Sequence, residues 1–444
     1  MSSAPATPLS DQELAAVRAD FPYLERPARN GESLAYLDWA ATSQKPSRVM
    51  EKEAEFLSLS NGAAGRSTYQ IADEATQAWE DARDAVAGFV GARGSELVFT
   101  KNATEAINLV ALAIGHASLG RPAARGGGPA DADDPARRLA IGVGDEIVVT
   151  RAEHHANLVP WQELAARTGA ALRWLDLTED GRIDSATTRV MTERTRVLAL
   201  THASNVTGAI TPLAGILPAA RAIGALVVLD TCQSAAHLPL DFAALSAAGV
   251  DAMVLSSHKM LGPTGVGALV ATEELLAAMP PVLTGGSMIE VVTMESSTYM
   301  SGPARFEAGS QPLAQAAGWR ASVEYLAHLG MDRLHAGERV LTQQVLGGLA
   351  GIDGLRVLGP ADTTERLGVV AFTIDGVHPH DVGQVLDSSG VAVRTGHHCA
   401  QPIHRHFGVH ASSRVSFGPC TTTAEVERFL EAVASVRSYF RRRA

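Results

Sequence analysis

Short runs of Val, Leu, Ile and Ala recur along this sequence, and helical segments separate most of them. A continuous apolar run of four to six residues is typical of a strand that is buried on both faces. The alternation therefore predicts an α/β fold, with a large, mostly parallel sheet that helices cover on both faces. The runs are residues 147–150, 170–175, 197–201, 226–229, 252–256 and 267–270.

The segments on either side complete the predicted organisation. Residues 11–24 predict an amphipathic helix, and 34–38 a short strand. Further helices are expected at 46–59, 73–90, 105–114, 313–329, 333–349 and 423–439, and further strands at 96–100, 369–374 and 391–394. The pattern changes after Pro312, which predicts a large domain over residues 30–311 and a smaller α+β domain formed by 1–29 and 312–444. Residues 120–140 form a low-complexity insert that we expect to be a mobile surface loop.

Composition excludes several classes of function. The net charge of −11 argues against a surface that binds nucleic acid, since the one basic run is residues 441–443. No apolar run approaches the roughly 20 residues of a membrane-spanning helix, and the first residues do not resemble a signal peptide. We therefore expect a cytoplasmic protein without a membrane partner. Its three cysteines form neither a disulfide framework nor a zinc spacing, so no metal is expected.

Lysine is scarce, and this restricts where amine chemistry can occur. The chain holds only Lys45, Lys52, Lys101 and Lys259, and arginine cannot be deprotonated in a protein. Lys259 follows a predicted buried strand and precedes a glycine-rich turn. Burial at a strand end lowers the pKa of an amine, and a neutral amine can form a Schiff base with a carbonyl. An exposed loop lysine is an equally good interpretation of this segment alone.

Two other predicted strands also end in polar residues. Asp230 follows the run 226–229, where it could pair with a cationic ring nitrogen or merely cap a turn. His154 and His155 follow the run 147–150. They could stack on a planar cofactor, bind a metal or form a solvated pair, although no carboxylate follows at a zinc spacing.

Two loops carry the remaining candidates. Asn102-Ala103-Thr104 opens a predicted helix, where free amides suit a phosphate, although a plain helix cap explains the pattern equally well. The segment Arg394-Thr395-Gly396-His397-His398-Cys399 surrounds a cysteine with groups that favour its thiolate form. Arg394 and Arg414 could clamp a carboxylate, whereas Cys399 could also be a small buried apolar residue.

Taken together, these signals match the requirements of a pyridoxal phosphate site. Such a site needs a Schiff-base lysine, an acid beside the pyridine nitrogen, and groups that bind anions at both ends.

At this point the sequence resembles a known family. Nearly the whole chain is similar to the group II (SufS-type) cysteine desulfurases, within the class V aminotransferase superfamily of fold-type I pyridoxal phosphate enzymes. The segment ending in Cys399 is the most specific of the matching motifs, which also include residues 35–38, 153–157, 201–205, 257–259 and 305–309.

The resemblance implies a role for each candidate. Lys259 binds the cofactor and moves protons, and Cys399 attacks the sulfur of L-cysteine to form a persulfide and release alanine. In the cofactor site, Asp230 pairs with the pyridine nitrogen, Gln233 contacts the phenolic oxygen and His154 stacks on the ring. The phosphate is bound by Ala103, Thr104, Ser256 and His258, with Ser310 reaching in from the second subunit of a homodimer. The substrate carboxylate is held by Asn205, Arg414 and Arg394.

The resemblance also implies that the sulfur passes to a SufE- or SufU-like sulfur-acceptor protein, for iron–sulfur clusters or a related product. The sequence departs from the family in three places. Gly65 stands where the family has histidine, residues 416–420 lack the usual tyrosine and asparagine, and the insert is extra. A selenocysteine lyase, another class V C–S lyase or an aminotransferase-like epimerase is therefore the alternative. A non-enzymatic scaffold is less consistent with Lys259, Asp230, His154 and Cys399 all being present.

Overall fold

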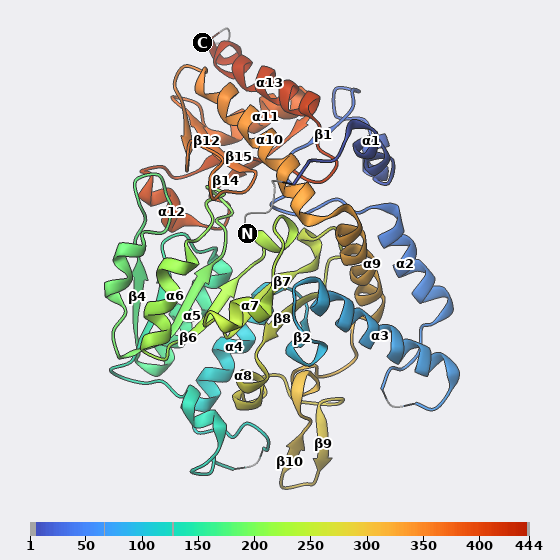
Figure 1. Cartoon of the computed structure of the whole chain (residues 1–444), viewed down its shortest axis with the longest axis vertical. Coiled ribbons are helices and arrows are strands. Elements are labelled where there is room, and N and C mark those ends of the chain that lie inside the picture. The colour runs from blue at the N-terminus through green and yellow to red at the C-terminus, as the bar shows by residue number, and fades with distance from the viewer. Residues whose placement is uncertain (1–5, 66, 127, 442–444) are drawn as a thin grey trace.

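A seven-stranded sheet forms the centre of the larger domain in the computed structural model, which describes residues 6–65, 67–126 and 128–441 (Figure 1). Arg66 of the Gly65 loop, and Arg442 and Arg443 of the basic run, lie outside these residues. Only β8 runs antiparallel to its neighbours, so the predicted mostly parallel sheet is confirmed. The strand order is β2 (Leu97–Thr100), β8 (Gly267–Ala271), β7 (Ala252–Ser256), β6 (Leu226–Asp230), β5 (Thr195–Thr201), β3 (Glu146–Thr150) and β4 (Ala171–Leu175).

Helices cover both faces of this sheet and enclose two apolar cores. Alternate residues of β5 show the division, because Leu198 and Leu200 pack in one core while Val197 and Ala199 pack in the other. This is the two-sided burial that the apolar runs predict. The helices of this domain are α2 (Ser47–Leu59), α3 (Gln70–Phe89), α4 (Ala103–Ser118), α5 (Val159–Thr168), α6 (Leu213–Ala222), α7 (Phe242–Ala247), α8 (Glu273–Ala278) and α9 (Leu313–Leu329).

The smaller domain is built on an antiparallel sheet with a core of its own, in the orange and red part of Figure 1. Its strand order is β11 (Leu355–Leu358), β12 (Val369–Ile374), β15 (Ser412–Ser416) and β14 (Arg394–Gly396). A separate parallel pair joins β1 (Ala35–Tyr36) to β13 (Val391–Ala392). The helices are α1 (Asp11–Ala19), α10 (Met331–Ala350), α11 (Pro379–Ser388), α12 (Gln401–His406) and α13 (Thr423–Arg441).

Some contacts cross the domain boundaries expected at residues 30 and 312. β1 pairs with β13 of the smaller domain, and α9 packs against α2 and α3 of the larger one. These contacts favour placing residues 35–36 with the smaller domain and α9 with the larger.

The predicted helix over residues 11–24 is wrong in its second half. α1 ends at Ala19, and Pro22 begins a separate 3₁₀ turn that extends to Glu25. Proline has no amide hydrogen and its ring clashes with the preceding turn, so Pro22 could not continue α1.

The insert has defined contacts with a hairpin that the sequence did not predict. The hairpin consists of β9 (Ile289–Val292) and β10 (Ser297–Tyr299) and projects from the larger domain (Figure 1). Backbone hydrogen bonds join Gly126 to Ser297 and Tyr299 to Ala124. The insert therefore adds a short third segment to the hairpin.

Candidate active site

The carboxyl ends of β3, β5, β6 and β7 meet at a polar cavity of about 220 Å³. Parallel strands open at the same edge of a sheet, so residues far apart in the sequence come together there. Most of the residues expected from the sequence line this cavity, whereas Cys399 and Ser310 do not. The expected residues that line it are Ala103, Thr104, His154, Asn205, Asp230, Gln233, Ser256, His258, Lys259, Arg394 and Arg414.

Lys259 lies in a 3₁₀ turn, Ser257–Lys259, directly after β7. The carbonyl of His258 fixes this turn by accepting hydrogen bonds of 2.8 Å from both the amide and the hydroxyl of Ser43. His258 Nδ1 lies 3.1 Å from Thr42 Oγ1, and burial and nearby Lys259 lower the pKa of His258 to about 4. The lysine is thus presented on a turn that the loop after β1 holds in place.

The start of α4 forms an anion-binding end of the cavity. The Ala103 amide donates to Ser256 Oγ (3.0 Å) and the Glu105 amide to Asn102 Oδ1 (3.0 Å). Among the described residues no acceptor is found for the Thr104 amide. A Cβ on Gly267 would lie 2.5 Å from Asn102 Cα, so only glycine lets β8 come this close to the start of α4. A free amide beside hydroxyl groups at a helix N-terminus suits a phosphate.

The opposite wall presents an acid and an imidazole. Asp230 Oδ1 accepts from the Cys232 amide (2.9 Å), while its Oδ2 has no hydrogen bond among the described residues. His154 Nδ1 accepts from the Ala156 amide (3.0 Å), so its ring proton is on Nε2. Burial, followed by Lys259, lowers the pKa of His154 to about 4, which keeps the ring neutral. Gln233 Nε2 donates to the carbonyl of Ala40 (3.0 Å).

These groups fit pyridoxal phosphate. Asp230 has a free carboxylate oxygen for a pyridinium nitrogen, His154 offers a neutral ring for stacking, and α4 offers donors for the phosphate. The fit rests on these donors and acceptors and on the close approach of β8 to the start of α4 at Gly267.

Arginines gather at the side of the cavity that faces the smaller domain. Arg414 is fully buried and donates from Nη2 to Asp38 Oδ1 and from Nη1 to the Asn205 carbonyl, both at 2.9 Å. Its Nε is buried and has no partner among the described residues. Arg394 lies directly across from Arg414 on β14 and pairs with no carboxylate among the described residues. Because Asp38 is the one carboxylate that pairs with these two arginines in the described part of the chain, a net positive charge remains. That charge suits a substrate carboxylate.

The Cys399 loop follows β14 beside this cavity. Cys399 itself is half-buried, and Asn205 Nδ2 donates to the carbonyl of His398, the residue before Cys399 (2.7 Å). His398 lines the cavity although the sequence did not single it out for a role. Asn205 therefore ties the cysteine loop to the cavity wall, in addition to any contact with substrate.

Ser310 lies on the outer side of the anion-binding end. It lines a different cavity, of about 560 Å³, and Thr104 lines both. A single chain therefore gives Ser310 no direct place beside Lys259.

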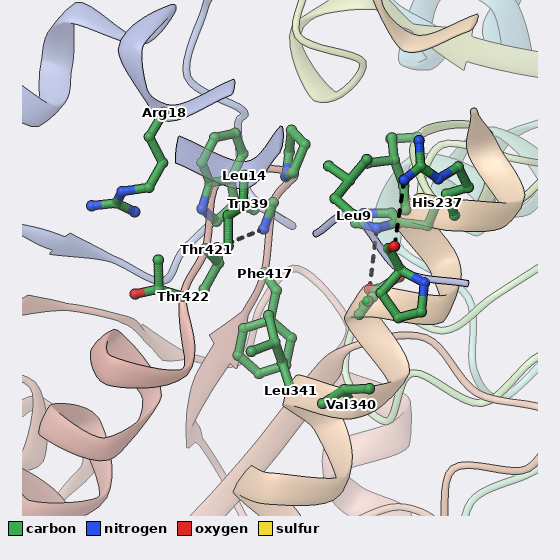
Figure 2. A pocket seen from close by; sticks show the side chains of 18 of the residues that line it. Leu9, Leu14, Arg18, Trp39, His237, Val340, Leu341, Phe417, Thr421 and Thr422 are labelled. Atoms are coloured by element: carbon green, nitrogen blue, oxygen red, sulfur yellow. Dashed lines mark hydrogen bonds and ion pairs between the residues drawn. The ribbon is translucent and has the colours of Figure 1, made fainter. Parts of the chain in front are cut away.

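A larger cavity of about 500 Å³ lies behind Lys259 and is lined mainly by apolar side chains such as Leu14, Trp39 and Phe417 (Figure 2). Lys259 is common to both cavities. Of the charged residues at the larger one, Arg18 pairs with Glu425 and Arg333 with Glu13. The smaller cavity holds the donors that suit an anionic ligand, among them the Thr104 amide and Arg414 Nε.

A buried network that includes Glu153 supports the His154 turn. Glu153 accepts from the Thr201 amide (2.9 Å), the Asn157 side chain (2.6 Å) and the Thr150 hydroxyl (2.6 Å). Asn157 Oδ1 in turn accepts from Trp161 Nε1 (3.0 Å). Glu153 thus joins the ends of β3 and β5, and a polar residue directly after a predicted buried strand was the signal for it in the sequence.

We expect Glu153→Ala to lower the free energy of unfolding by at least about 3 kcal/mol, because three buried donors lose their acceptor. Burial raises the pKa of Glu153 to about 8, so the folded protein retains a proton that the unfolded chain releases above about 4.5. The contribution of Glu153 to the free energy of unfolding is therefore complete below about pH 4.5 and is lost as the pH rises through about 8. Denaturant unfolding at several pH values measures it.

The matched control is Glu51→Ala, on the exposed side of α2, which should change stability by less than about 0.5 kcal/mol. A difference between wild type and Glu153→Ala that grows with pH would contradict the assignment.

Another motif from the sequence proves to be structural. Glu307 is buried and receives two hydrogen bonds from Arg83, at 2.7 and 2.8 Å, and one from the Phe99 amide (2.8 Å). Arg305 donates to the backbone carbonyls of Met300, Leu276 and Ala277. The segment 305–309 therefore fastens the end of the hairpin region to the sheet.

Comparisons with known proteins agree with this geometry. The sequence matches the family described as Aminotransferase class-V over residues 35–123 and 135–429, which leaves the middle of the insert unmatched. A probable cysteine desulfurase 2 of Mycobacterium leprae is 49% identical over 434 residues, covering 98% of this chain and 99% of the relative. A probable cysteine desulfurase of Streptomyces coelicolor is 45% identical and covers 96% and 97%.

Solved structures give the same result. The cysteine desulfurase CsdA of Escherichia coli, in an S-sulfonic acid form, has a TM-score of 0.83 and 34% identity, over 96% of this chain and 98% of the other. The apo cysteine desulfurase of Thermococcus onnurineus has a TM-score of 0.86 and 32% identity, over 99% and 100%. No helix within the described parts of the chain is long and apolar enough to cross a membrane.

Proposed function

This chain belongs to the class V aminotransferase family, among its cysteine desulfurases, and we propose that it converts L-cysteine to L-alanine with Cys399 as the sulfur acceptor. The observation that carries the proposal is the anchoring of the Cys399 loop to the wall of the Lys259 cavity through Asn205. A lysine and an acid alone would serve many reactions of amino acids. A half-buried thiol on a loop that is joined to the cavity wall favours sulfur transfer.

Pyridoxal phosphate, when bound, supplies an electron sink that makes the Cα–H of an attached amino acid acidic. We propose that Asp230 and His154 hold its ring and that α4 and Ser256 hold its phosphate, with His258 and Gln233 nearby. Arg414, through its unpartnered Nε, and Arg394 bind the substrate carboxylate. Ion pairing with Asp38 fixes the direction of the Arg414 guanidinium. The substrate is thereby oriented with its carboxylate toward the smaller domain, which also carries Cys399.

Proton transfer and sulfur transfer then fall to two residues. Lys259 Nζ takes the proton from the substrate Cα and can return one. The Cys399 thiolate attacks the substrate sulfur, a sulfur–sulfur bond forms, and the Cβ–S bond breaks. The electron pair of that bond stays on Cβ, which takes up a proton. L-cysteine and one protein thiol thus give L-alanine and one persulfide, and no external oxidant or reductant is required.

The finer parts of the proposal concern partners. We propose a homodimer in which Ser310 of one subunit reaches the phosphate end of the other, since Ser310 lies outside the Lys259 cavity of its own chain. We also propose that the persulfide sulfur passes to an acceptor protein for iron–sulfur cluster assembly or a related product. The half-buried position of Cys399 supports such a transfer, because an acceptor must reach the sulfur.

Mass spectrometry of the protein after incubation with L-cysteine, together with alanine quantification, tests the proposed reaction. We expect one added sulfur on the peptide that contains Cys399, and alanine formed beyond one equivalent once a reductant removes that sulfur. Bound cofactor without added sulfur or alanine would contradict the proposal. Faster release of selenium from selenocysteine than of sulfur from cysteine would favour the lyase alternative.

A further inference from the structure

The backbone around Cys399 adopts a conformation that side chains rarely allow. His398 and Cys399 have φ angles of 50° and 55°, so two consecutive residues other than glycine lie in the left-handed region. Each such residue costs of the order of 1 kcal/mol, and the conformation persists only where the surroundings enforce it. The hydrogen bonds of this loop should therefore show what holds the thiol in place.

The carbonyl groups of the loop are all occupied. The His397 carbonyl accepts from the Ala400 amide (2.8 Å), that of His398 from Asn205, and that of Ala400 from His404 Nδ1 (2.9 Å). The carbonyl of Cys399 accepts from the His155 amide (2.7 Å). The bonds to Cys399 and its neighbours thus come from outside the loop.

His155 makes a second bond to the same loop, through its side chain. The Gln401 amide donates to His155 Nε2 (3.1 Å), so His155 holds the chain on both sides of Ala400. An amide can only donate, so Nε2 must carry a lone pair and the ring proton must be on Nδ1. A protonated imidazole has no lone pair and cannot form this bond.

We propose that neutral His155 is a positioning residue for Cys399. Its two hydrogen bonds to residues 399–401, called the clasp below, hold the thiol for attack on the substrate sulfur. This inference rests on the proposed function. It assigns His155 a role separate from that of its neighbour His154, which faces the cofactor cavity.

The surroundings of His155 favour its neutral form. Burial, followed by the nearby His397 ring at 5.7 Å between centroids, lowers the pKa of His155 below its usual range. The other titratable groups that face it are His154 on its own turn and His404 on α12. The clasp is thus complete near neutral pH and opens as the pH falls through a value below that of an ordinary histidine.

His155→Leu and His155→Gln test the proposal as a pair. Leucine removes the acceptor, whereas the amide oxygen of glutamine lies near the position of Nε2 and cannot be protonated. We expect leucine to slow single-turnover persulfide formation about 10- to 100-fold, because small displacements of a reacting group have effects of this size. KM and the visible absorbance of the bound cofactor should not change. Glutamine should restore most of the rate. The matched control is His328→Leu, at an exposed histidine of α9 outside both the polar cavity and the Cys399 loop, which should react within about twofold of wild type.

Hydrogen exchange of the Gln401 amide provides a readout that needs no catalysis. We expect exchange about tenfold faster in His155→Leu than in His155→Gln. In wild type, exchange relative to the glutamine variant should accelerate as the pH falls through a value below that of an ordinary histidine. If leucine leaves both the amide protection and the single-turnover rate unchanged, or if glutamine behaves like leucine, the clasp is refuted.

The two proposals fail in different ways. A wild-type protein that forms neither persulfide nor alanine would refute the proposed function, while the exchange measurement would still judge the clasp. If His155→Leu does not fold, the pH profiles of wild type and His155→Gln decide the question.

Discussion

Alanine in place of Lys259 is expected to reduce alanine formation from L-cysteine by at least about a thousandfold, because the group that moves the Cα proton is lost. The chain holds only three other lysines, and Lys259 is the one that lines the polar cavity. Lys45 lies nearby, but its Nζ donates to the carbonyls of Ser43 and His258 and it does not line the cavity, so it should not replace Lys259. The variant should also lose the visible absorbance of tightly bound cofactor after dialysis, which spectrophotometry measures.

Lys52→Ala is the matched control for this experiment. Lys52 lies on α2, exposed and paired with Glu55, so its removal should leave rate and absorbance unchanged. Small primary amines added to Lys259→Ala should restore part of the rate, since they can carry the same proton. Turnover near the wild-type level without added amine would show that the lysine assignment is wrong.

The sequence predicted the cavity well because its residues follow buried strands. Asp230 is the last residue of β6, His154 and Lys259 follow β3 and β7, and parallel strands bring their carboxyl ends to one edge. At these positions the apolar runs in the sequence and the parallel strand order of the sheet therefore indicate the same site. The reversed direction of β8 was not predictable in this way, because an apolar run carries no information about strand direction.

Interactions between distant segments could not be predicted. Asp38 and Arg414 are far apart in the sequence and pair only because β1 and β15 meet beside the cavity. The left-handed pair His398 and Cys399 could not be predicted, since contacts with Asn205 and His155 from distant segments hold this conformation. The hairpin β9–β10 was missed because its strands are short and exposed, with no alternating apolar face.

Serine in place of Cys399 should separate cofactor chemistry from sulfur transfer. The hydroxyl is a far weaker nucleophile than a thiolate and cannot carry a persulfide, so we expect alanine formation to fall at least about a hundredfold. Cofactor absorbance and L-cysteine binding should persist, because Cys399 does not line the polar cavity. Mass spectrometry and alanine quantification measure the two effects on one sample.

The other two cysteines provide matched controls, because both are buried. Burial raises the pKa of Cys420 to about 12 and that of Cys232 further, whereas Cys399 is half-buried in its loop. A buried neutral thiol is a poor nucleophile, so Cys232→Ser and Cys420→Ser should still gain one sulfur at Cys399. Cys232 is the more stringent control, because it lines the cofactor cavity and lies near Ser256. Persulfide on Cys232 in the Cys399→Ser variant, with alanine formed at the wild-type rate, would transfer the acceptor role to that residue. If Cys399→Ser instead gains no sulfur and still binds the cofactor, Cys399 is the thiol that receives the sulfur.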